Sequence, residues 1–506
     1  MTSASPRQVL LINPTITSRR SARFPLAVLN LSASLDGRYA TSIIDGNIDR
    51  DFVSTVLNRL SSQAIDAIGV SVMGGPQLVT AIALSQAVRA RFPSIPIIWG
   101  GYFPTISAEA SLREPYVDYA IRGQGEATLC ELLDAHFDRD TAGLQNIGGL
   151  SWRSEDAIIH NPNRPFAPSG LARELPYERL GDPRQYLGRT YLGQRTAAYQ
   201  AALGCRFRCT FCGVATMFRG RTSLPAPERL EHDLKYLTTR LNADSLLVYD
   251  HNFFDREEDM LPLLEVLAKY KLPWWCYARS DALVNLSERA WALVRKSRLR
   301  MAYIGAESPS DWMLHDIRKG TRTNQTLEAI KTCERNGVIP ELSFMLAPPH
   351  DPEGETEKTF AYIRQIKRVH PRSEIMLYMY APLPPAPGAR SPHTERAVSV
   401  LRTASGAPLE FPTTATQWAQ PQWLKYWCHA DTPWMTPRLR QRIQDFTTVL
   451  GCRFPTMTDV RTSRWSKTAL QALASWRYSL QRYQSPWELE MSRKFIRLWD
   501  PRVSGL

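Results

Sequence analysis

Short apolar runs alternate with longer amphipathic stretches over the first ~135 residues of the chain. Five of these runs are expected to be strands, because each is short and apolar and most end at Gly, Asn or Asp. They cover residues 9–12, 41–44, 67–72, 96–99 and 118–121. Helical patterns separate the runs, for example at residues 24–35 and 52–60. Five β-α units at this spacing predict a doubly wound, Rossmann-like parallel sheet, which binds ligands beyond the carboxyl ends of its strands.

A second alternating series follows further along the chain. Its apolar runs cover residues 197–203, 245–249, 274–278, 301–304, 341–346 and 374–379. Helical patterns lie between them, for example at residues 229–237, 260–270 and 324–336. Six such repeats predict a full or partial β/α barrel, whose active site forms at the C-terminal mouth of the strands.

The pattern divides the chain into four parts. Residues 1–140 form the first sheet domain, and residues 141–190 are a connector rich in Pro, with one hairpin at 148–159. Residues 191–390 form the barrel. Residues 391–506 are mostly helical in pattern and rich in Trp and Arg, and we expect them to cap the barrel mouth or to shape a substrate pocket.

Composition narrows the function classes. Apolar residues make up 43% and charged residues 22% of the 506, as in an ordinary globular protein. The longest charge-free stretch contains a turn, so no membrane span is expected. The N-terminal apolar run is too short for a secretory signal, which predicts a cytoplasmic protein. In that reduced compartment, clustered cysteines suggest metal or redox chemistry.

The net charge of +13 is partly local. Residues 461–506 hold nine Lys or Arg against three Asp or Glu, together with four tryptophans. Such a tail suits a packed helical segment with solvated Arg, and the alternatives are binding to nucleic acid or to an anionic membrane. We favour the packed tail and expect no nucleic-acid partner.

Three cysteines, Cys205, Cys209 and Cys212, stand at C-x3-C-x2-C spacing just after the first strand of the second series. Thiolates suit iron–sulfur clusters, and three of them leave one iron of a cubane cluster free to hold a substrate. A structural zinc ion is the main alternative, but it normally takes four protein ligands in paired spacing. The other five cysteines are scattered, and we expect them to be core thiols. Among these, Cys276 has a pocket role as its alternative.

This cysteine loop, with Phe211 before the third cysteine, resembles the radical S-adenosylmethionine (SAM) superfamily. Together with the N-terminal sheet, residues 8–390 are similar to the cobalamin-dependent (class B) radical SAM enzymes. The resemblance implies that Cys205, Cys209 and Cys212 hold a [4Fe–4S] cluster whose fourth iron is chelated by SAM. It further implies that one electron from the cluster cleaves SAM to a 5′-deoxyadenosyl radical, which abstracts hydrogen from an unreactive carbon.

The resemblance also implies SAM contacts at the ends of several barrel strands. Phe211 and Asn252 would border SAM, and so would Tyr277. Arg279 could reach the SAM carboxylate or ribose as a bidentate donor. Glu307 is placed to accept hydrogen bonds from the ribose hydroxyls or from the methionine amino group.

The implied cobalamin site lies on the first sheet. A corrin ring needs close approach of backbone, which favours glycine. The motifs concerned are Ser71-Val72-Met73, Gly100-Gly101 with Tyr102, and Gly123-x-Gly125-Glu126; the expected contacts are Ser71, Met73, Gly100, Gly101, Tyr102, Gly123, Gly125 and Glu126. The alternative is a nucleotide-binding or purely structural domain, but the dinucleotide fingerprint is absent after the first strand. No histidine precedes His136, so this domain cannot supply the histidine that ligates cobalt in other cobalamin modules.

The resemblance favours a cobalamin-dependent radical SAM C-methyltransferase acting on a small-molecule or peptide substrate. A second hypothesis keeps the cofactors without net methylation, as in enzymes resembling the anaerobic magnesium-protoporphyrin ester cyclase. A third is a non-catalytic binding protein that uses its basic tail. The electron donor would be a flavodoxin or a ferredoxin. The sequence assigns no catalytic residue.

Overall fold

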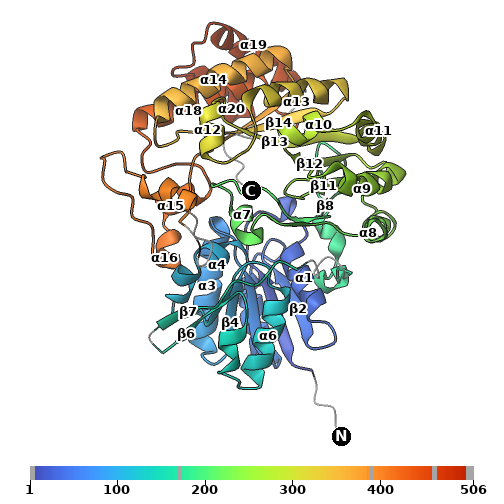
Figure 1. The fold of residues 1–506 in the computed structure, drawn as a ribbon, viewed down its shortest axis with the longest axis vertical. Coiled ribbons are helices and arrows are strands. Elements are labelled where there is room, and N and C mark those ends of the chain that lie inside the picture. Colours follow the sequence, from blue (N-terminus) through green and yellow to red (C-terminus); the bar gives the residue numbers. More distant parts are fainter. Residues whose placement is uncertain are drawn as a thin grey trace.

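The computed structural model describes residues 6–155, 157–167, 174–384, 386, 392–458 and 464–496. Figure 1 shows the N-terminal sheet domain at one end of the molecule and the second sheet with its helices at the other. The last helices, α18 (Pro437–Arg453), α19 (Arg464–Ser479) and α20 (Trp487–Ile496), lie against the second sheet domain. No helix within the described residues is long and apolar enough to cross a bilayer.

The first sheet contains the five strands that the apolar runs predict. They are β1 (Gln8–Asn13), β2 (Ala40–Asp45), β3 (Ala67–Ser71), β4 (Ile97–Gly100) and β5 (Tyr119–Ile121). All five are parallel, in the order β2-β1-β3-β4-β5. The connecting helices are α1 (Leu26–Ser34), α2 (Phe52–Ser62), α3 (Pro76–Arg91), α4 (Tyr102–Ile106) and α5 (Ala108–Leu112), and α6 (Glu126–Phe137) follows β5. The strand order reverses between β1 and β3, and ligands of such sheets bind at that point.

The expected hairpin is present and extends this sheet. Its strands are β6 (Leu150–Ser154) and β7 (Ala157–His160), and β6 pairs antiparallel with β5. Short 3-10 turns at Arg19–Ser21, Gly143–Asn146, Tyr177–Leu180 and Pro183–Tyr186 complete this half of the chain.

The second sheet has six parallel strands in the order β15-β14-β13-β12-β11-β8. Their bounds are β8 (Thr196–Tyr199), β11 (Ser245–Val248), β12 (Trp274–Ala278), β13 (Leu299–Glu307), β14 (Ile339–Leu346) and β15 (Glu374–Met379). Within the described residues β8 and β15 do not pair, so the sheet stays open. The barrel is therefore partial, and the closed form of the expectation is wrong.

Helices cover the outer face of this open barrel. They are α8 (Pro227–Thr239), α9 (Glu257–Tyr270), α10 (Ser280–Asn285), α11 (Glu288–Ser297), α13 (Thr323–Arg335) and α14 (Pro352–Val369). Helix α12 (Asp311–Asp316) instead packs into the core that the N-terminal domain shares with the C-terminal region. Between β8 and α8 the chain forms the small strands β9 (Leu203–Gly204) and β10 (Thr222–Ser223) and the helix α7 (Gly213–Phe218). Figure 1 shows α7 between the two halves of the molecule.

Alternation along β12 separates its two faces. Trp274 and Cys276 are fully buried in the core beneath the helices, where the Trp274 indole donates to the Ser297 hydroxyl at 3.0 Å. Trp275 and Tyr277 lie on the opposite, inner face. Cys276 is therefore a core thiol, and its alternative role in a pocket is wrong.

The C-terminal helices divide into two groups. After α15 (Pro392–Ser399), the helices α16 (Ala415–Trp418) and α17 (Pro421–Trp427) pack against the N-terminal domain, where the Thr416 backbone N–H donates to Glu114 at 2.6 Å. In contrast, α18 packs on α14 through the stacked rings of Phe360 and Phe446, whose centroids are 3.7 Å apart.

The charged tail is helical where it is described. In α19 and α20, Leu470, Ala474 and Leu489 are buried. Exposed tryptophans, Trp465, Trp476 and Trp487, stand on the same two helices, and Trp499 lies outside the described residues.

Candidate functional site

The cysteine loop leaves β9 and ends at the first turn of α7. Cys212 is the residue before that helix, and the backbone N–H groups of Val214 and Ala215 point at its sulfur. The Phe207 backbone does the same for Cys205. Burial raises the pKa of both thiols, to about 11 for Cys212, and the neighbouring Cys209 raises them further. Backbone donors at sulfur favour the thiolate, so the loop is built to hold metal-bound sulfur.

The three sulfurs do not surround a single ion. Among the described residues, no three His, Cys, Asp or Glu side chains group tightly enough to hold one metal ion. Each cysteine of a cubane cluster binds a different iron, so its sulfurs stand further apart than the ligands of one zinc ion. The loop thus fits an iron–sulfur cluster better than the zinc alternative.

One side of the loop is held by a polar group after β11. Arg206 forms an ion pair with Asp255 at 2.7 Å, and the Asn252 side-chain amide donates to the same carboxylate at 3.3 Å. The carbonyl oxygen of Asn252 is buried and has no hydrogen-bond partner among the described residues. Asn252 therefore offers a free acceptor beside the loop, as a SAM contact would require.

The other side of the loop rests on Arg279. Its guanidinium lies 3.5 Å from the ring centre of Phe207 and pairs with Asp281 at 3.0 Å. It also donates to the Lys319 backbone carbonyl at 2.6 Å. Arg279 is only 4% exposed, and within the described part of the chain only its Nη1 atom has no protein partner. Its observed role is to brace the cluster loop, which leaves little of it to contact SAM.

Glu307 ends β13 in a buried ion pair with Lys319 at 2.7 Å. Its φ of 62° lies in the left-handed region, which is unusual for a residue other than glycine and turns the chain sharply at the strand end. A Cβ at Gly305 would lie 2.2 Å from the Glu307 carboxylate, so glycine is needed there. The Lys319 ammonium lies 5.9 Å from the ring centre of Phe211, which places this pair next to the cluster loop.

Sequence reasoning missed Lys319, which belongs to no motif. The segment that carries it also binds the loop directly, because the Thr210 N–H donates to the Ile317 carbonyl at 3.0 Å. A lysine shortly after the strand that ends at Glu307 is the only signal that could have found it.

Tyr277 is placed away from these groups, among aromatic side chains on the inner face of the sheet. Its ring centre lies 4.6 Å from that of Trp275 and 5.1 Å from that of Tyr303. The Tyr303 hydroxyl donates to that of Tyr378 at 3.0 Å, and the Trp275 indole donates to Glu341 at 2.7 Å. Burial raises the pKa of Glu341 to about 7. These residues form an aromatic inner face with polar tips.

The expected cobalamin contacts gather at one edge of the first sheet. Met73 follows β3, is 42% exposed, and donates its N–H to the Gln77 side chain at 2.8 Å. Gln77 in turn donates to Asn13 and to the Pro14 carbonyl, at 3.0 and 2.8 Å. This network fixes the loops after β1 and β3 at the point where the strand order reverses.

The glycines at this edge have positive φ angles or close neighbours. Gly101 has φ 99°, and a Cβ there would approach the Val72 carbonyl to 3.1 Å. Gly123 has φ 73° and donates its N–H to the Thr105 hydroxyl at 2.9 Å. Burial raises the pKa of Glu126, and one of its oxygens has no hydrogen-bond partner within the described chain. Ser71 and Gly100 end neighbouring strands, and Gly125 precedes α6. A flat ligand can therefore approach this backbone closely.

The two predicted sites meet at α7. The Tyr102 hydroxyl lies against Gly213, where an added Cβ would be only 1.8 Å away, and the Gly213 N–H points at that hydroxyl. A Cβ on Gly123 would approach the Met217 carbonyl to 3.6 Å. The loops of the first sheet thus touch the residue that follows Cys212.

The C-terminal region completes this edge, which the sequence did not indicate. The indole of Trp427 lies on Gly74, where a Cβ would be 1.6 Å from the ring, and the Cys428 sulfur lies on Gly75. The Trp427 ring also contacts Phe103 and Tyr102, at centroid distances of 5.3 and 5.8 Å. Helix α17 therefore shapes the loop after β3.

Two family models match this chain, each over one of the two sheets. The B12 binding domain matches residues 13–133, and the radical SAM superfamily matches residues 199–363. The chain belongs to the cobalamin-binding radical SAM enzymes. Its cofactors are a [4Fe–4S] cluster, SAM and cobalamin.

Individual relatives of this radical SAM enzyme are distant. It is 22% identical to an uncharacterised methyltransferase of Pyrococcus horikoshii over 68% of this chain and 73% of the relative. It is 23% identical to the anaerobic magnesium-protoporphyrin IX monomethyl ester cyclase of Synechocystis sp., over 66% and 67% of the two chains.

A solved structure shares the whole fold. The radical SAM methyltransferase TsrM from Kitasatospora setae superposes with a TM-score of 0.67, covering 92% of this chain and 96% of that one at 17% identity.

Proposed function

We propose that this enzyme is a C-methyltransferase that moves a methyl group from SAM to an unactivated carbon of a small-molecule or peptide substrate. When bound, the cluster supplies the electron that cleaves SAM, and cobalamin carries the methyl group. The proposal rests on one observation above all, the contact of the first sheet's ligand edge with the cluster loop through Tyr102 and Gly213.

Through that contact, both halves of the chain would have access to one substrate carbon. Transfer of a group between two cofactor sites requires the reacting atoms to be held within contact distance of each other. Here the glycine loops after β4 and β5 lie on α7, the helix that begins directly after Cys212.

The chain's own residues have distinct roles in this proposal. Asp281 and Phe207 hold Arg279, which fixes the loop of Cys205, Cys209 and Cys212 from one side. The free carbonyl of Asn252 would accept a hydrogen bond from SAM. Glu307, held by Lys319, would accept from the ribose hydroxyls or the methionine amino group.

The inner face of the open barrel would receive the substrate. Trp275, Tyr277 and Tyr303 give it aromatic surface, and the tips of Tyr378 and Glu341 add hydrogen-bonding groups. This lining suits a planar or aromatic molecule that carries a few polar groups. Water exclusion at that face would protect a radical intermediate.

A second candidate keeps the cofactors but gives no net methylation. The relative from Synechocystis sp. is named a cyclase, and it matches over a share of the chain similar to that of the methyltransferase relative. An oxidative cyclisation or rearrangement is the alternative outcome at the same site.

The test is anaerobic reconstitution of the full chain with iron, sulfide and cobalamin, followed by incubation with SAM, a reductant and candidate substrates. We expect both 5′-deoxyadenosine and S-adenosylhomocysteine, and a product heavier by one CH₂. Deoxyadenosine without S-adenosylhomocysteine, with loss of hydrogen or gain of oxygen in the product, would support the cyclase candidate. A flavodoxin or a ferredoxin is the proposed physiological reductant.

A further inference from the structure

A cavity lies far from the cofactor edge of the second sheet. Its volume is about 610 Å³, and it is lined by the C-terminal ends of α14, α18 and α19, by the start of β15 and by the middle of α19. Parallel strands begin at this side, whereas the cluster loop stands at the ends of the strands. The cavity is therefore separate from the site described above. Its size is that of pockets that hold small molecules.

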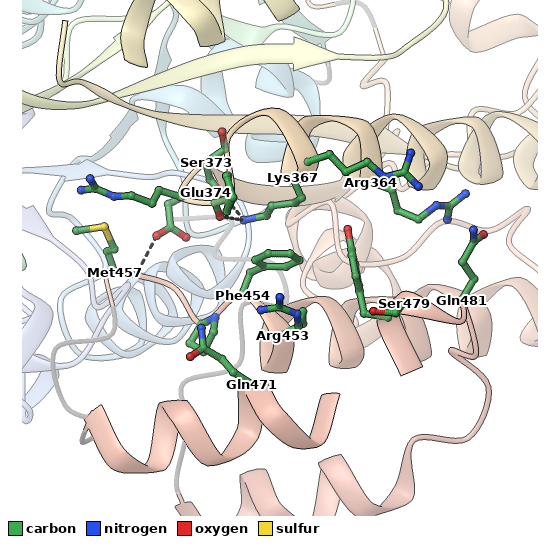
Figure 2. Close-up of a pocket in the computed structure, with 15 residues that line it drawn as sticks. Arg364, Lys367, Ser373, Glu374, Arg453, Phe454, Met457, Gln471, Ser479 and Gln481 are labelled. Atoms are coloured by element: carbon green, nitrogen blue, oxygen red, sulfur yellow. Dashed lines mark hydrogen bonds between the residues drawn. The ribbon is translucent and has the colours of Figure 1, made fainter. Parts of the chain in front are cut away.

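Cationic side chains dominate the cavity. Arg364, Lys367, Arg368, Arg372 and Arg453 line it, and Glu374 is the one acidic residue in its lining. Figure 2 shows the labelled cations on both sides of the cavity, with Arg364 and Lys367 on one element and Arg453 on the facing one. Within the described chain, none of the four arginines forms an ion pair with a carboxylate.

The local backbone does not neutralise this charge. Three helices, α14, α18 and α19, end at the cavity, and each C-terminus carries about half a negative charge. With Glu374 this amounts to roughly two and a half negative charges against five positive ones. Helix dipoles therefore account for only part of the cluster, and an excess of about two to three positive charges is left for a ligand.

Two buried polar groups, the Lys367 ammonium and the Tyr478 hydroxyl, belong to this cavity. Lys367 is 6% exposed, and its ammonium donates to the backbone carbonyls of Pro371 and Ser373. The hydroxyl of Tyr478 is buried and has no hydrogen-bond partner among the described residues. Burial raises the pKa of Tyr478, and the charges of Arg364, Arg368 and Arg453 oppose that rise, so these guanidiniums lie around the free hydroxyl.

One wall is aromatic. The rings of Phe454 and Tyr478 meet edge to face with centroids 5.1 Å apart, and the Lys367 ammonium lies 4.5 Å from the centre of the Phe454 ring. A ligand that fills the cavity would thus meet both cationic groups and an aromatic wall.

We propose that this cavity binds a phosphorylated small molecule, with its phosphate groups on Arg368, Arg372, Arg453 and the Tyr478 hydroxyl, and its organic part on the rings of Phe454 and Tyr478. A phosphate carries up to two charges and several acceptor oxygens, which the guanidinium forks can share. A single carboxylate would leave most of the positive charge unpaired. The concave shape favours a small molecule over an acidic protein, which would need a broad surface.

The test is calorimetric titration of the full chain, without SAM or reductant, with inorganic pyrophosphate and with ADP. We expect saturable binding at one site, with ADP tighter than pyrophosphate because of the aromatic wall. The double variant R368Q/R372Q should weaken pyrophosphate binding by at least about tenfold. Tyr478→Phe should weaken it by several-fold with no loss of thermal stability, because the hydroxyl makes no hydrogen bond in the free protein.

A control variant shows whether any loss of affinity is specific to the cavity. The double variant R50Q/R240Q removes two exposed arginines elsewhere and should leave the affinity unchanged. Equal pyrophosphate affinity in wild type and R368Q/R372Q would overturn the proposal, as would succinate binding as tightly as pyrophosphate. Absence of saturable binding to the wild type would also overturn it. Because no radical chemistry is involved, failure of the methyltransferase proposal would not affect this result.

Discussion

The two ends of the second sheet treat charge in opposite ways. At the carboxyl ends of the strands, two buried cations have carboxylate partners: Arg279 pairs with Asp281, and Lys319 with Glu307. At the starting end, around β15, four arginines line a cavity without any ion pair among the described residues. Paired charges hold a scaffold in one geometry, whereas unpaired charges of one sign are suited to a ligand that brings the opposite sign.

The largest effect is expected at the cluster loop. Cys209→Ala removes one of three thiolates, and a cluster held by two cysteines is not retained. We expect iron content and cluster absorbance to fall to background after anaerobic reconstitution, and SAM cleavage to stop. Cys333→Ala, which removes a fully buried core thiol, should keep both. Full iron content in Cys209→Ala would contradict the assignment of the loop.

The next largest effect is expected for the buried ion pair at the carboxyl ends of the strands. Lys319→Met leaves the Glu307 carboxylate buried without its partner, and we expect a loss of about 3–5 kcal/mol in the free energy of unfolding. The double variant E307Q/K319M should recover most of that loss, because no lone charge is left buried. Chemical denaturation of the cofactor-free chain measures the free energy of unfolding of the wild type, of Lys319→Met and of the double variant. Equal losses in the single and double variants would show that packing, not charge, holds this edge.

Glu341 lies near the start of β14, in register with Glu374 of β15, and gives a pH test. Its pKa is raised to about 7 by burial, so the folded chain binds an extra proton between the ordinary glutamate value and pH 7. Stability from this group is therefore highest below that window and falls as the pH rises through it. Glu341→Gln should be more stable than wild type at pH 8, by up to about 3 kcal/mol, with little difference at pH 4. A pH-independent difference in melting temperature would contradict this.

The smallest effect on stability is expected for the arginines of the cavity at the starting end of the sheet. R368Q/R372Q breaks no ion pair in the described structure, so the unfolding free energy without ligand should stay within about 0.5 kcal/mol of wild type, or rise slightly through lower repulsion. Pyrophosphate should then raise the melting temperature of the wild type but not of this variant. A large loss of stability in the variant would show that these arginines serve the fold.

Local patterns predicted the elements well, because short apolar runs that end in turn residues mark buried parallel strands. The five parallel strands of the first sheet and the six strands of the second lie where those runs stand. The cysteine loop was also visible, since its three ligands are local in sequence. Whether the second sheet closes was not visible, because closure depends on how β8 and β15 are placed in space.

The parts of the site that the sequence did not reveal depend on contacts between distant residues. Lys319 pairs with Glu307, a residue twelve positions earlier that ends β13 in a left-handed conformation. Trp427 reaches Gly74 from the far end of the chain. The cavity at β15 combines residues from three helices, none of which carries a recognisable motif. Periodicity reports which side chains are buried, but not which distant ones become neighbours.

The ring of Trp427 on Gly74 has a practical consequence for anyone who dissects this enzyme. Both recognised family regions end before residue 364, so a protein truncated after the second region would still contain both of them. Such a fragment would lack the indole that covers the β3 loop and would leave Phe103 uncovered on that side. Swapping or trimming modules in this enzyme must therefore carry residues 415–428 along with the N-terminal half.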